Sequence, residues 1–203
     1  MIRAFIFDIG NVLLRFDFSL AVNRLAAHSD TAAETLLAAL EPVKAAYENG
    51  DIARSEFQQR IGEVLRFAGT ERELVSAWEE IFTENGPMTA LVEKMHGSYP
   101  LYLLSNTSDL HMDYVFRTYP VFRFFHDGVY SYRAKCSKPG RKIFEIAIEQ
   151  FKVIPAETIY IDDLAPNVET ALQLGFRAIQ YDPDNHDALL ATLLGEGISC
   201  LEG

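Results

Sequence analysis

Cysteine and positive charge are both scarce in this 203-residue sequence. It has 2 cysteines, Cys136 and Cys200, so a disulfide framework is not expected and a reducing, cytoplasmic setting fits. Lysine and arginine together number 18 against 29 aspartates and glutamates, and the net charge of −11 disfavours nucleic acid or an anionic membrane as a partner. No apolar run reaches the roughly 18 residues of a membrane span, so no association with a membrane is expected.

Two common nucleotide-binding motifs are also missing. The chain contains neither G-x-G-x-x-G nor G-x-x-x-x-G-K-[ST], which argues against a dinucleotide-binding site or a P-loop nucleotide-binding site of the usual kind. The 5 histidines show no metal-ligand spacing. What remains is an ordinary globular composition, and its length fits one domain or a core with a modest insertion.

The first strand and the turn after it organise the rest of the chain. Three apolar residues, Phe5 to Phe7, run directly into Asp8, which is the pattern of a buried parallel strand. In an open α/β sheet, ligands bind beyond the carboxyl ends of the strands. Asp8 at such an end is a candidate reacting group, and Gly10 lets the backbone come close to a ligand.

The second half of the chain alternates strands and helices. Strands are predicted at 101–104, 128–132, 158–161 and 176–181, with helices at about 89–96, 110–118, 142–151, 166–174 and 186–194. This alternation predicts an α/β fold with a doubly wound, Rossmann-like parallel sheet.

A helical segment separates the first strand from the others. Between about Phe18 and Phe82 the pattern is helical, with Asp17 or Ser19, Asp30 or Thr31, Pro42, Ser55 and Thr70 as candidate helix starts and Asn49-Gly50 as a stop. Glu34 and Glu73 stand near capping-box positions. We expect an inserted α-helical module at 15–85 and an α/β core formed by 1–14 and 86–203.

Polar clusters follow the apolar part of three strands. They are Asp8, the run Ser105-Asn106-Thr107, and the pair Asp162-Asp163. The carboxyl ends of parallel strands meet at one edge, so these groups are expected to lie together. Simple helix capping by Ser105 and Asn106, or a favourable acid pair at a helix N-terminus, is the alternative explanation.

Four motifs in this order resemble the haloacid dehalogenase superfamily, whose members are mostly magnesium-dependent phosphatases. They are FIFDIGNV, LYLLSNT, SKPGRKIF with Lys138, and IYIDDLAPN ending at Asn167. The helical segment matches the cap that the family inserts after its first motif. The resemblance implies hydrolysis of a small phosphorylated metabolite, such as a sugar phosphate, through an aspartyl-phosphate on Asp8.

The resemblance also implies roles for the other strand-end residues. Ser105, Asn106 and Thr107 would bind phosphate oxygens, Lys138 would stabilise charge in the transition state, and Asn167 would orient Lys138 or the loop. Mg²⁺ would be held by Asp8, the Gly10 carbonyl and Asp163, with Asp162 acting directly or through water. The cation is needed because two like charges about 4 Å apart repel by roughly 4 kcal/mol at an effective dielectric near 20.

One position departs from the family pattern. Most of its phosphatases carry a second aspartate, a proton donor, two residues after the nucleophile, where this chain has Gly10. A subset with Asp-x-Gly-Asn-Val, which includes α-D-glucose-1-phosphate phosphatases, is the most similar. Asp17 and Glu48 are the candidate substitutes for the missing acid.

Two other functions stay open. A metal-independent 2-haloacid dehalogenase uses the same aspartate and also lacks the second one, although Arg15 is misplaced for its arginine. A regulator that binds a phosphorylated ligand without turnover is the non-enzymatic alternative. The chain is expected to be a monomer or a homodimer.

Overall fold

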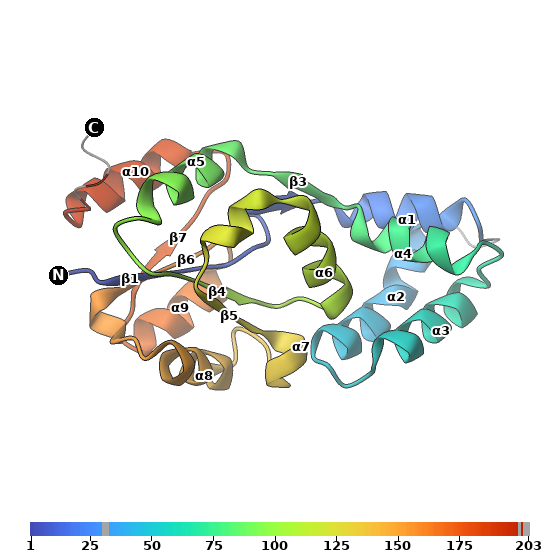
Figure 1. The fold of residues 1–203 in the computed structure, drawn as a ribbon. Helices are drawn as coiled ribbons and strands as arrows, with labels where there is room; N and C mark the ends of the chain where they lie inside the picture. The colour runs from blue at the N-terminus through green and yellow to red at the C-terminus, as the bar shows by residue number, and fades with distance from the viewer. Residues whose placement is uncertain (30–32, 199, 201–203) are drawn as a thin grey trace.

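Five parallel strands form the central sheet of the described part of the chain (Figure 1). The computed structural model describes residues 1–29, 33–198 and 200, without the side chains of 33, 34, 36 and 37. The strand order is β5-β4-β1-β6-β7. The strands are β1 Ala4–Phe7, β4 Leu101–Ser105, β5 Asp127–Tyr130, β6 Thr158–Asp162 and β7 Arg177–Gln180. The predicted doubly wound, Rossmann-like fold is confirmed, and β1 stands at its centre between β4 and β6.

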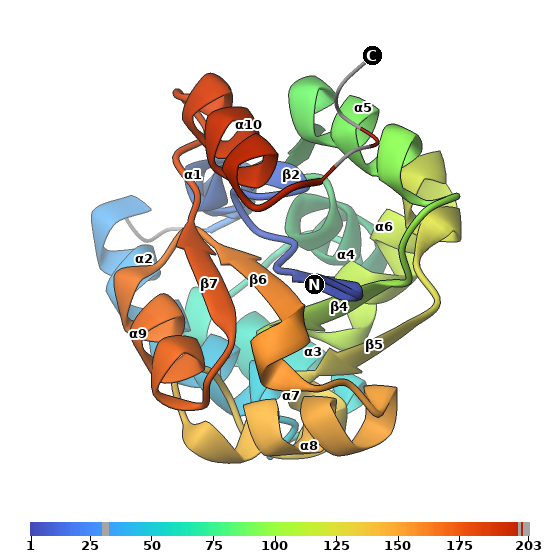
Figure 2. The same ribbon diagram turned by 90° about the vertical axis from the view of Figure 1, so that its left-hand side faces the viewer.

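Helices cover both faces of this sheet (Figure 2). Side chains alternate along β1, so Phe5 and Phe7 join one apolar cluster and Ile6 joins the other. The first face packs against α5 Gly86–Met95, α6 Asp109–Thr118 and α10 His186–Gly195. The second packs against α8 Arg141–Phe151 and α9 Ala165–Gln173. Short elements complete this part: η1 Pro120–Phe124, α7 Ser131–Ala134 and η2 Pro155–Glu157.

A block of four helices lies to one side of the sheet (Figure 1). It consists of α1 Phe18–Ala26, α2 Ala33–Glu48, α3 Arg54–Leu65 and α4 Glu71–Glu79. Its apolar cluster includes the fully buried Trp78, against which Phe57 packs edge to face. Two predicted helix starts are confirmed, because Asp17 accepts a hydrogen bond from the Ser19 amide and Thr70 forms a capping box.

The prediction of a helix start at Pro42 is wrong, because α2 continues through this proline. Leu40, Val43 and Tyr47 are all buried at helical spacing, and their packing favours one continuous helix over the break that proline alone predicts. The stop at Asn49-Gly50 is confirmed, with Gly50 at φ +69°. The predicted caps Asp30 and Thr31 and the side chain of Glu34 lie outside the described residues. Helix α3 begins at Arg54, one residue before the predicted Ser55.

A two-stranded antiparallel ribbon joins the helical block to the sheet. It pairs β2 Leu14–Phe16 with β3 Phe82–Glu84, and neither strand was predicted. Three residues are too few to show a strand period, so the sequence carries no clear signal for the ribbon. The ribbon brackets the helical block, and the division into a core and a cap at 14/15 and 85/86 stays a prediction.

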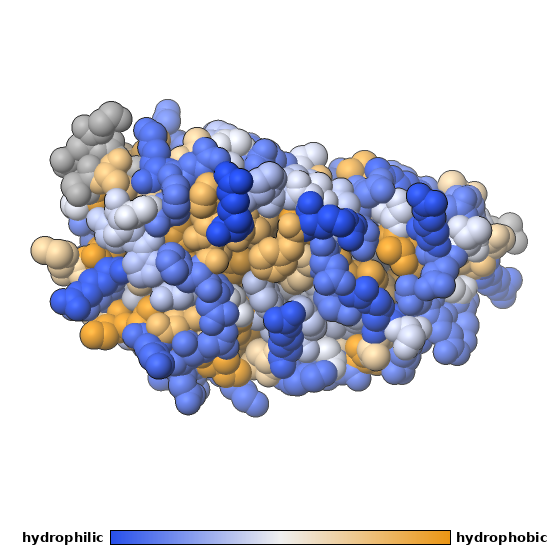
Figure 3. Space-filling model, in the orientation of Figure 1, coloured by the Kyte–Doolittle hydropathy of each residue, from blue (hydrophilic) through white to orange (hydrophobic). Residues whose placement is uncertain are grey.

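The visible surface is mostly hydrophilic, with an apolar area over α6 and η1 (Figure 3). Phe116, on α6, is 50% exposed. Within the described ranges, the helices fall short of the length and apolar character that crossing a bilayer requires.

Candidate active site

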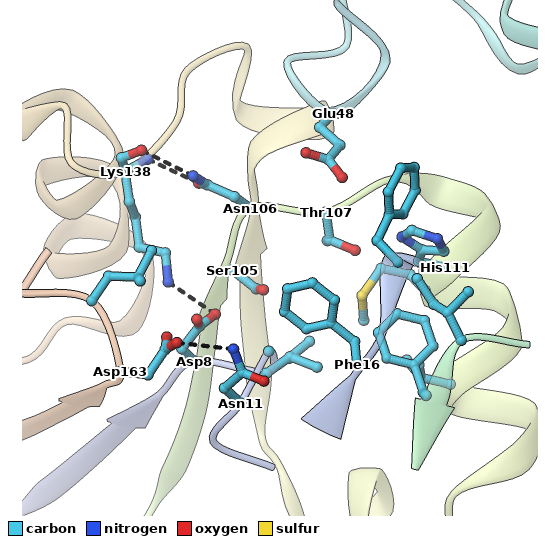
Figure 4. Close-up of a pocket in the computed structure, with 18 of the residues that line it drawn as sticks. Asp8, Asn11, Phe16, Glu48, Ser105, Asn106, Thr107, His111, Lys138 and Asp163 are labelled. Carbon is cyan, nitrogen blue, oxygen red and sulfur yellow. Dashed lines mark hydrogen bonds and ion pairs between the residues drawn. The ribbon is translucent and has the colours of Figure 1, made fainter. Parts of the chain in front are cut away.

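The polar strand ends converge at one edge of the sheet (Figure 4). Asp8 follows β1, Ser105 closes β4, and Asp162 and Asp163 stand at the end of β6. One carboxylate oxygen from each of Asp8, Asp162 and Asp163 lies within 4.8 Å of the other two. The parallel pairing of β1 with both β4 and β6 produces this convergence.

Lys138 lies between two of these carboxylates. Its Nζ is 2.9 Å from Asp8 Oδ1 and 2.6 Å from Asp162 Oδ2, and its side chain is fully buried. The Asn106 amide fixes its backbone, since Nδ2 donates to Lys138 O and Oδ1 accepts from Lys138 N, each at 2.9 Å. These contacts engage both ends of the Asn106 side chain. They favour positioning of Lys138 over direct binding of phosphate by that amide.

Asp162 is buried and its oxygens accept hydrogen bonds from several sides. The donors are Lys138 Nζ, Asn167 Nδ2 at 2.9 and 3.0 Å, the Leu164 amide at 2.9 Å and the Tyr160 hydroxyl. Asn167 therefore acts on Lys138 through Asp162 and not by direct contact. With both oxygens engaged, Asp162 is better placed to anchor the lysine than to contact a cation directly.

Asp163 is held by a residue that the sequence did not single out. Asn11 Nδ2 donates to Asp163 Oδ2 at 3.0 Å, and the backbone N–H of Asn11 donates to Leu14 O at 2.7 Å. Asn11 has φ +53°, a left-handed conformation that asparagine tolerates better than most residues. The sequence signal that could have identified this residue is an asparagine directly after Gly10.

Ser105 and Thr107 line the cavity and do not cap the following helix. The cap of α6 is Ser108, whose hydroxyl accepts from the His111 amide at 3.4 Å. Ser131 Oγ accepts from the Thr107 amide at 2.9 Å and lies 3.1 Å from Thr107 O, which holds this turn in place. The capping alternative therefore does not account for Ser105 or Asn106.

Burial and the neighbouring charges shift the titration of the whole cluster. Burial raises the pKa of Asp8 to about 6, with Lys138 opposing and Asp162 adding to the rise. Burial would lower the pKa of Lys138, but Asp8 and Asp162 raise it above its usual value. Burial would raise the pKa of Asp162, but the charge of Lys138 and the hydrogen bonds that Asp162 accepts lower it. Burial also raises the pKa of Asp163.

The donor set fits a hard divalent cation. Three carboxylates face one ammonium, so the cluster carries excess negative charge. The buried Asp8 Oδ1 accepts no hydrogen bond from the described residues, although Lys138 lies near it as an ion pair. Buried polar atoms normally have partners, and a cation bound by oxygens would supply one.

A cavity of about 270 Å³ opens from this cluster. Its polar end carries Asp8, Lys138, Asp163 and the β4 turn, and its other end is apolar, with Phe16, Phe18, Ile81, Phe82, Met112 and Val115. Lys44, Glu48 and His111 also line it. Of the two candidate substitutes for the missing acid, Glu48 reaches the cavity. Asp17 is exposed and caps α1. The apolar lining could not be recognised in the sequence, because its residues come mainly from α1, α6 and the ribbon of β2 and β3, which meet only in the folded chain.

Comparisons with known proteins identify the family. Residues 2–175 match the model of haloacid dehalogenase-like hydrolases, so the chain belongs to this family and the resemblance predicted from the sequence is confirmed. A curated relative, the D-ribitol-5-phosphate phosphatase of Bacteroides thetaiotaomicron, is 29% identical over 196 residues, which cover 91% of this chain and 93% of the relative.

Two solved structures are similar over most of both chains. One is a HAD family enzyme of Bacteroides thetaiotaomicron in complex with magnesium and inorganic phosphate, at 26% identity and a TM-score of 0.81, covering 90% of this chain and 96% of that one. The other is a predicted HAD-like hydrolase of Porphyromonas gingivalis, at 26% identity and a TM-score of 0.83, covering 96% and 98%.

Proposed function

We propose that this protein is a Mg²⁺-dependent phosphatase of a small sugar phosphate. The observation that carries the proposal is the group of Asp8, Asp162, Asp163 and Lys138 at one sheet edge, where Asp8 Oδ1 is paired with Lys138 and accepts no hydrogen bond from the described residues. The phosphatase name of the curated relative and the magnesium and phosphate in the related structure support the same class.

The residues present divide the chemistry between them. Asp8 attacks the phosphorus and takes the phosphoryl group onto its carboxylate, and water then hydrolyses this aspartyl-phosphate. Lys138 faces Asp8 and stabilises charge on the transferred group, while Ser105 and Thr107 with the backbone of their turn bind its oxygens. Asp8, the Gly10 carbonyl and Asp163 would hold Mg²⁺, which supplies positive charge between the carboxylate and the phosphate.

The size and lining of the cavity support a small substrate. A volume of about 270 Å³ suits a metabolite and not a polymer. The relative's substrate, D-ribitol 5-phosphate, and α-D-glucose 1-phosphate, suggested by the DIGNV turn, are the first compounds to test.

The other functions lack a supporting observation. A dehalogenase would need an arginine at the site, but Arg15 is exposed and bonded to Asp184 and to Pro183 O, each at 2.8 Å. A binding regulator would keep the same contacts without turnover, so an activity measurement decides between it and the phosphatase.

The test is a screen of phosphorylated metabolites with Mg²⁺ that follows release of inorganic phosphate. We expect activity on a sugar phosphate that Asp8→Asn abolishes and that a chelator removes reversibly. Asp51→Asn, which changes an exposed carboxylate that does not line the cavity, is the matched control and keeps full activity. Activity that survives Asp8→Asn, or tight binding with no hydrolysis over hours, would refute the proposal.

A further inference from the structure

The position that usually supplies the proton to the leaving group is closed in this chain. A Cβ on Gly10 would lie 3.0 Å from Phe16 Cε1 and 3.3 Å from Phe16 Cδ1. The Phe16 ring therefore fills the space next to Gly10 and has no proton to give. An alkoxide leaving group still needs a proton, so another wall of the cavity must provide it.

Few titratable side chains remain among the described residues that line the cavity. Asp8, Asp163 and Lys138 belong to the phosphate end, which leaves Lys44, Glu48 and His111. His111 is fixed by its Nε2, 3.1 Å from Trp78 O, and burial lowers its pKa to about 4, so it is neutral near pH 7. Lys44 forms ion pairs with Glu48 at 3.2 Å and Glu41 at 3.7 Å.

Glu48 is built into the wall that faces the phosphate end. It is the last residue of α2, and its backbone oxygen accepts a hydrogen bond from Ser131 Oγ at 2.5 Å. Its side chain is 18% exposed, and its carboxylate lies across Ser105, Asn106 and Thr107 from Asp8 (Figure 4). Burial raises the pKa of Glu48, Lys44 opposes this and Glu41 adds to it, so the protonated form extends to higher pH than for an exposed glutamate.

We propose, on the basis of the phosphatase function above, that Glu48 is the proton donor to the leaving oxygen. An in-line displacement sends the leaving group away from Asp8, toward the wall that carries Glu48. Asp8 Oδ bonds to phosphorus, the bond from phosphorus to the leaving oxygen breaks, and that oxygen takes the electron pair and the Glu48 proton to become an alcohol. In the second step the Glu48 carboxylate takes a proton from water as its oxygen attacks phosphorus, which frees inorganic phosphate and Asp8.

The experiment compares two leaving groups with Glu48→Gln, which keeps the shape and the backbone contact. Single-turnover release of p-nitrophenol from p-nitrophenyl phosphate needs no proton, whereas release of ribitol from D-ribitol 5-phosphate does. Measuring the first turnover separates leaving-group departure from hydrolysis of the phosphorylated aspartate. We expect ribitol release to fall about 100-fold or more and nitrophenol release to change by less than about threefold.

The matched control is Glu41→Gln, which removes the other carboxylate paired with Lys44. Glu41 is exposed and does not line the cavity, so both rates should match the wild type. Equal loss of both rates in Glu48→Gln would assign it a binding or structural role and overturn the proposal, and so would no loss in either. In those cases the phosphatase function still stands if Asp8→Asn is inactive. A wild type that releases neither product and hydrolyses no compound of the metabolite screen would refute the function and this inference together.

A second experiment tests the same reasoning by rescue of Glu48→Gln with a proton donor at another position. Phe16→Ala opens the space beside Gly10, and Gly10→Asp in that background places a carboxyl group at the family's usual position. Adding both changes to Glu48→Gln should recover ribitol release by about tenfold or more, since a general acid contributes 10²–10⁴-fold. No recovery of ribitol release, or an equal rise in nitrophenol release, would contradict a role in proton donation.

Discussion

His111 makes the stability of this protein depend on pH in a way that can be calculated. It is buried on α6, stacks on Trp78 with ring centroids 5.6 Å apart, and contacts Trp78 O through Nε2. Burial lowers its pKa from 6.5 to about 4, an effect that Lys44 strengthens and that the Trp78 carbonyl and Asp109 oppose. The folded protein therefore holds His111 neutral at a pH where the unfolded chain has protonated it.

Proton linkage gives the direction and the magnitude of the change in the free energy of unfolding that His111 causes. Between pH 6.5 and 4 the unfolded state binds more protons at this residue, so the free energy of unfolding falls as the pH falls. The full difference corresponds to about 3 kcal/mol, of which about 2 kcal/mol is lost between pH 7 and pH 5. Asp8, with a pKa raised to about 6, acts in the opposite direction, so the wild type alone does not isolate the histidine.

The measurement is urea unfolding at pH 7 and pH 5 for the wild type and His111→Gln. Glutamine keeps a donor for Trp78 O and does not titrate, while Asp8 contributes equally to both proteins. The fall in unfolding free energy from pH 7 to pH 5 should be smaller in the variant by about 2 kcal/mol. The single tryptophan, Trp78, reports unfolding by its fluorescence. His96→Gln, an exposed histidine, is the control, and an identical fall in wild type and His111→Gln would refute the reasoning.

Four further outcomes are expected. Lys138→Met leaves Asp8 and Asp162 buried without their cation, and urea unfolding should show a loss of about 3–5 kcal/mol. Thr70→Ala removes the capping box of α4 and should cost about 1 kcal/mol in the same assay. Mg²⁺ at 100 times its Kd should add about 2.7 kcal/mol to the unfolding free energy, and Asp163→Asn should abolish this gain. The Mg²⁺ affinity should weaken below pH 6, because Asp8 must lose a proton to bind the ion.

The strands and their polar ends were predictable from the sequence because the signal is local. A buried parallel strand is a short apolar run, and the runs before Asp8, Ser105 and Asp162 each end in a polar residue. The parallel arrangement follows from alternation with helices, and it brings these ends to one edge. Lys138 was identified as a site residue by the resemblance of its motif to the family, and not by any hydrophobic periodicity.

The remaining features depend on contacts that the local sequence does not contain. The ribbon of β2 and β3 has three residues in each strand, and its pairing joins positions about 70 apart in the chain. The course of α2 through Pro42 depends on packing of the helical block. At the site, the clamp by Asn106 and the ring of Phe16 beside Gly10 exist only once distant segments have met.

The two walls of the cavity are positioned by one set of contacts. Asn49, directly after Glu48, contacts Ser137, which directly precedes Lys138. Arg54 bonds to α6 at Asp109 and Asp113, and Tyr47 bonds to Asp109. The segment 47–54 thus ties the end of α2 to the loop that carries the lysine and to the helix that follows the phosphate turn. The distance between the nucleophilic carboxylate and the acid on the facing wall is therefore set by the docking of the helical block, and the site is complete only when the block is docked.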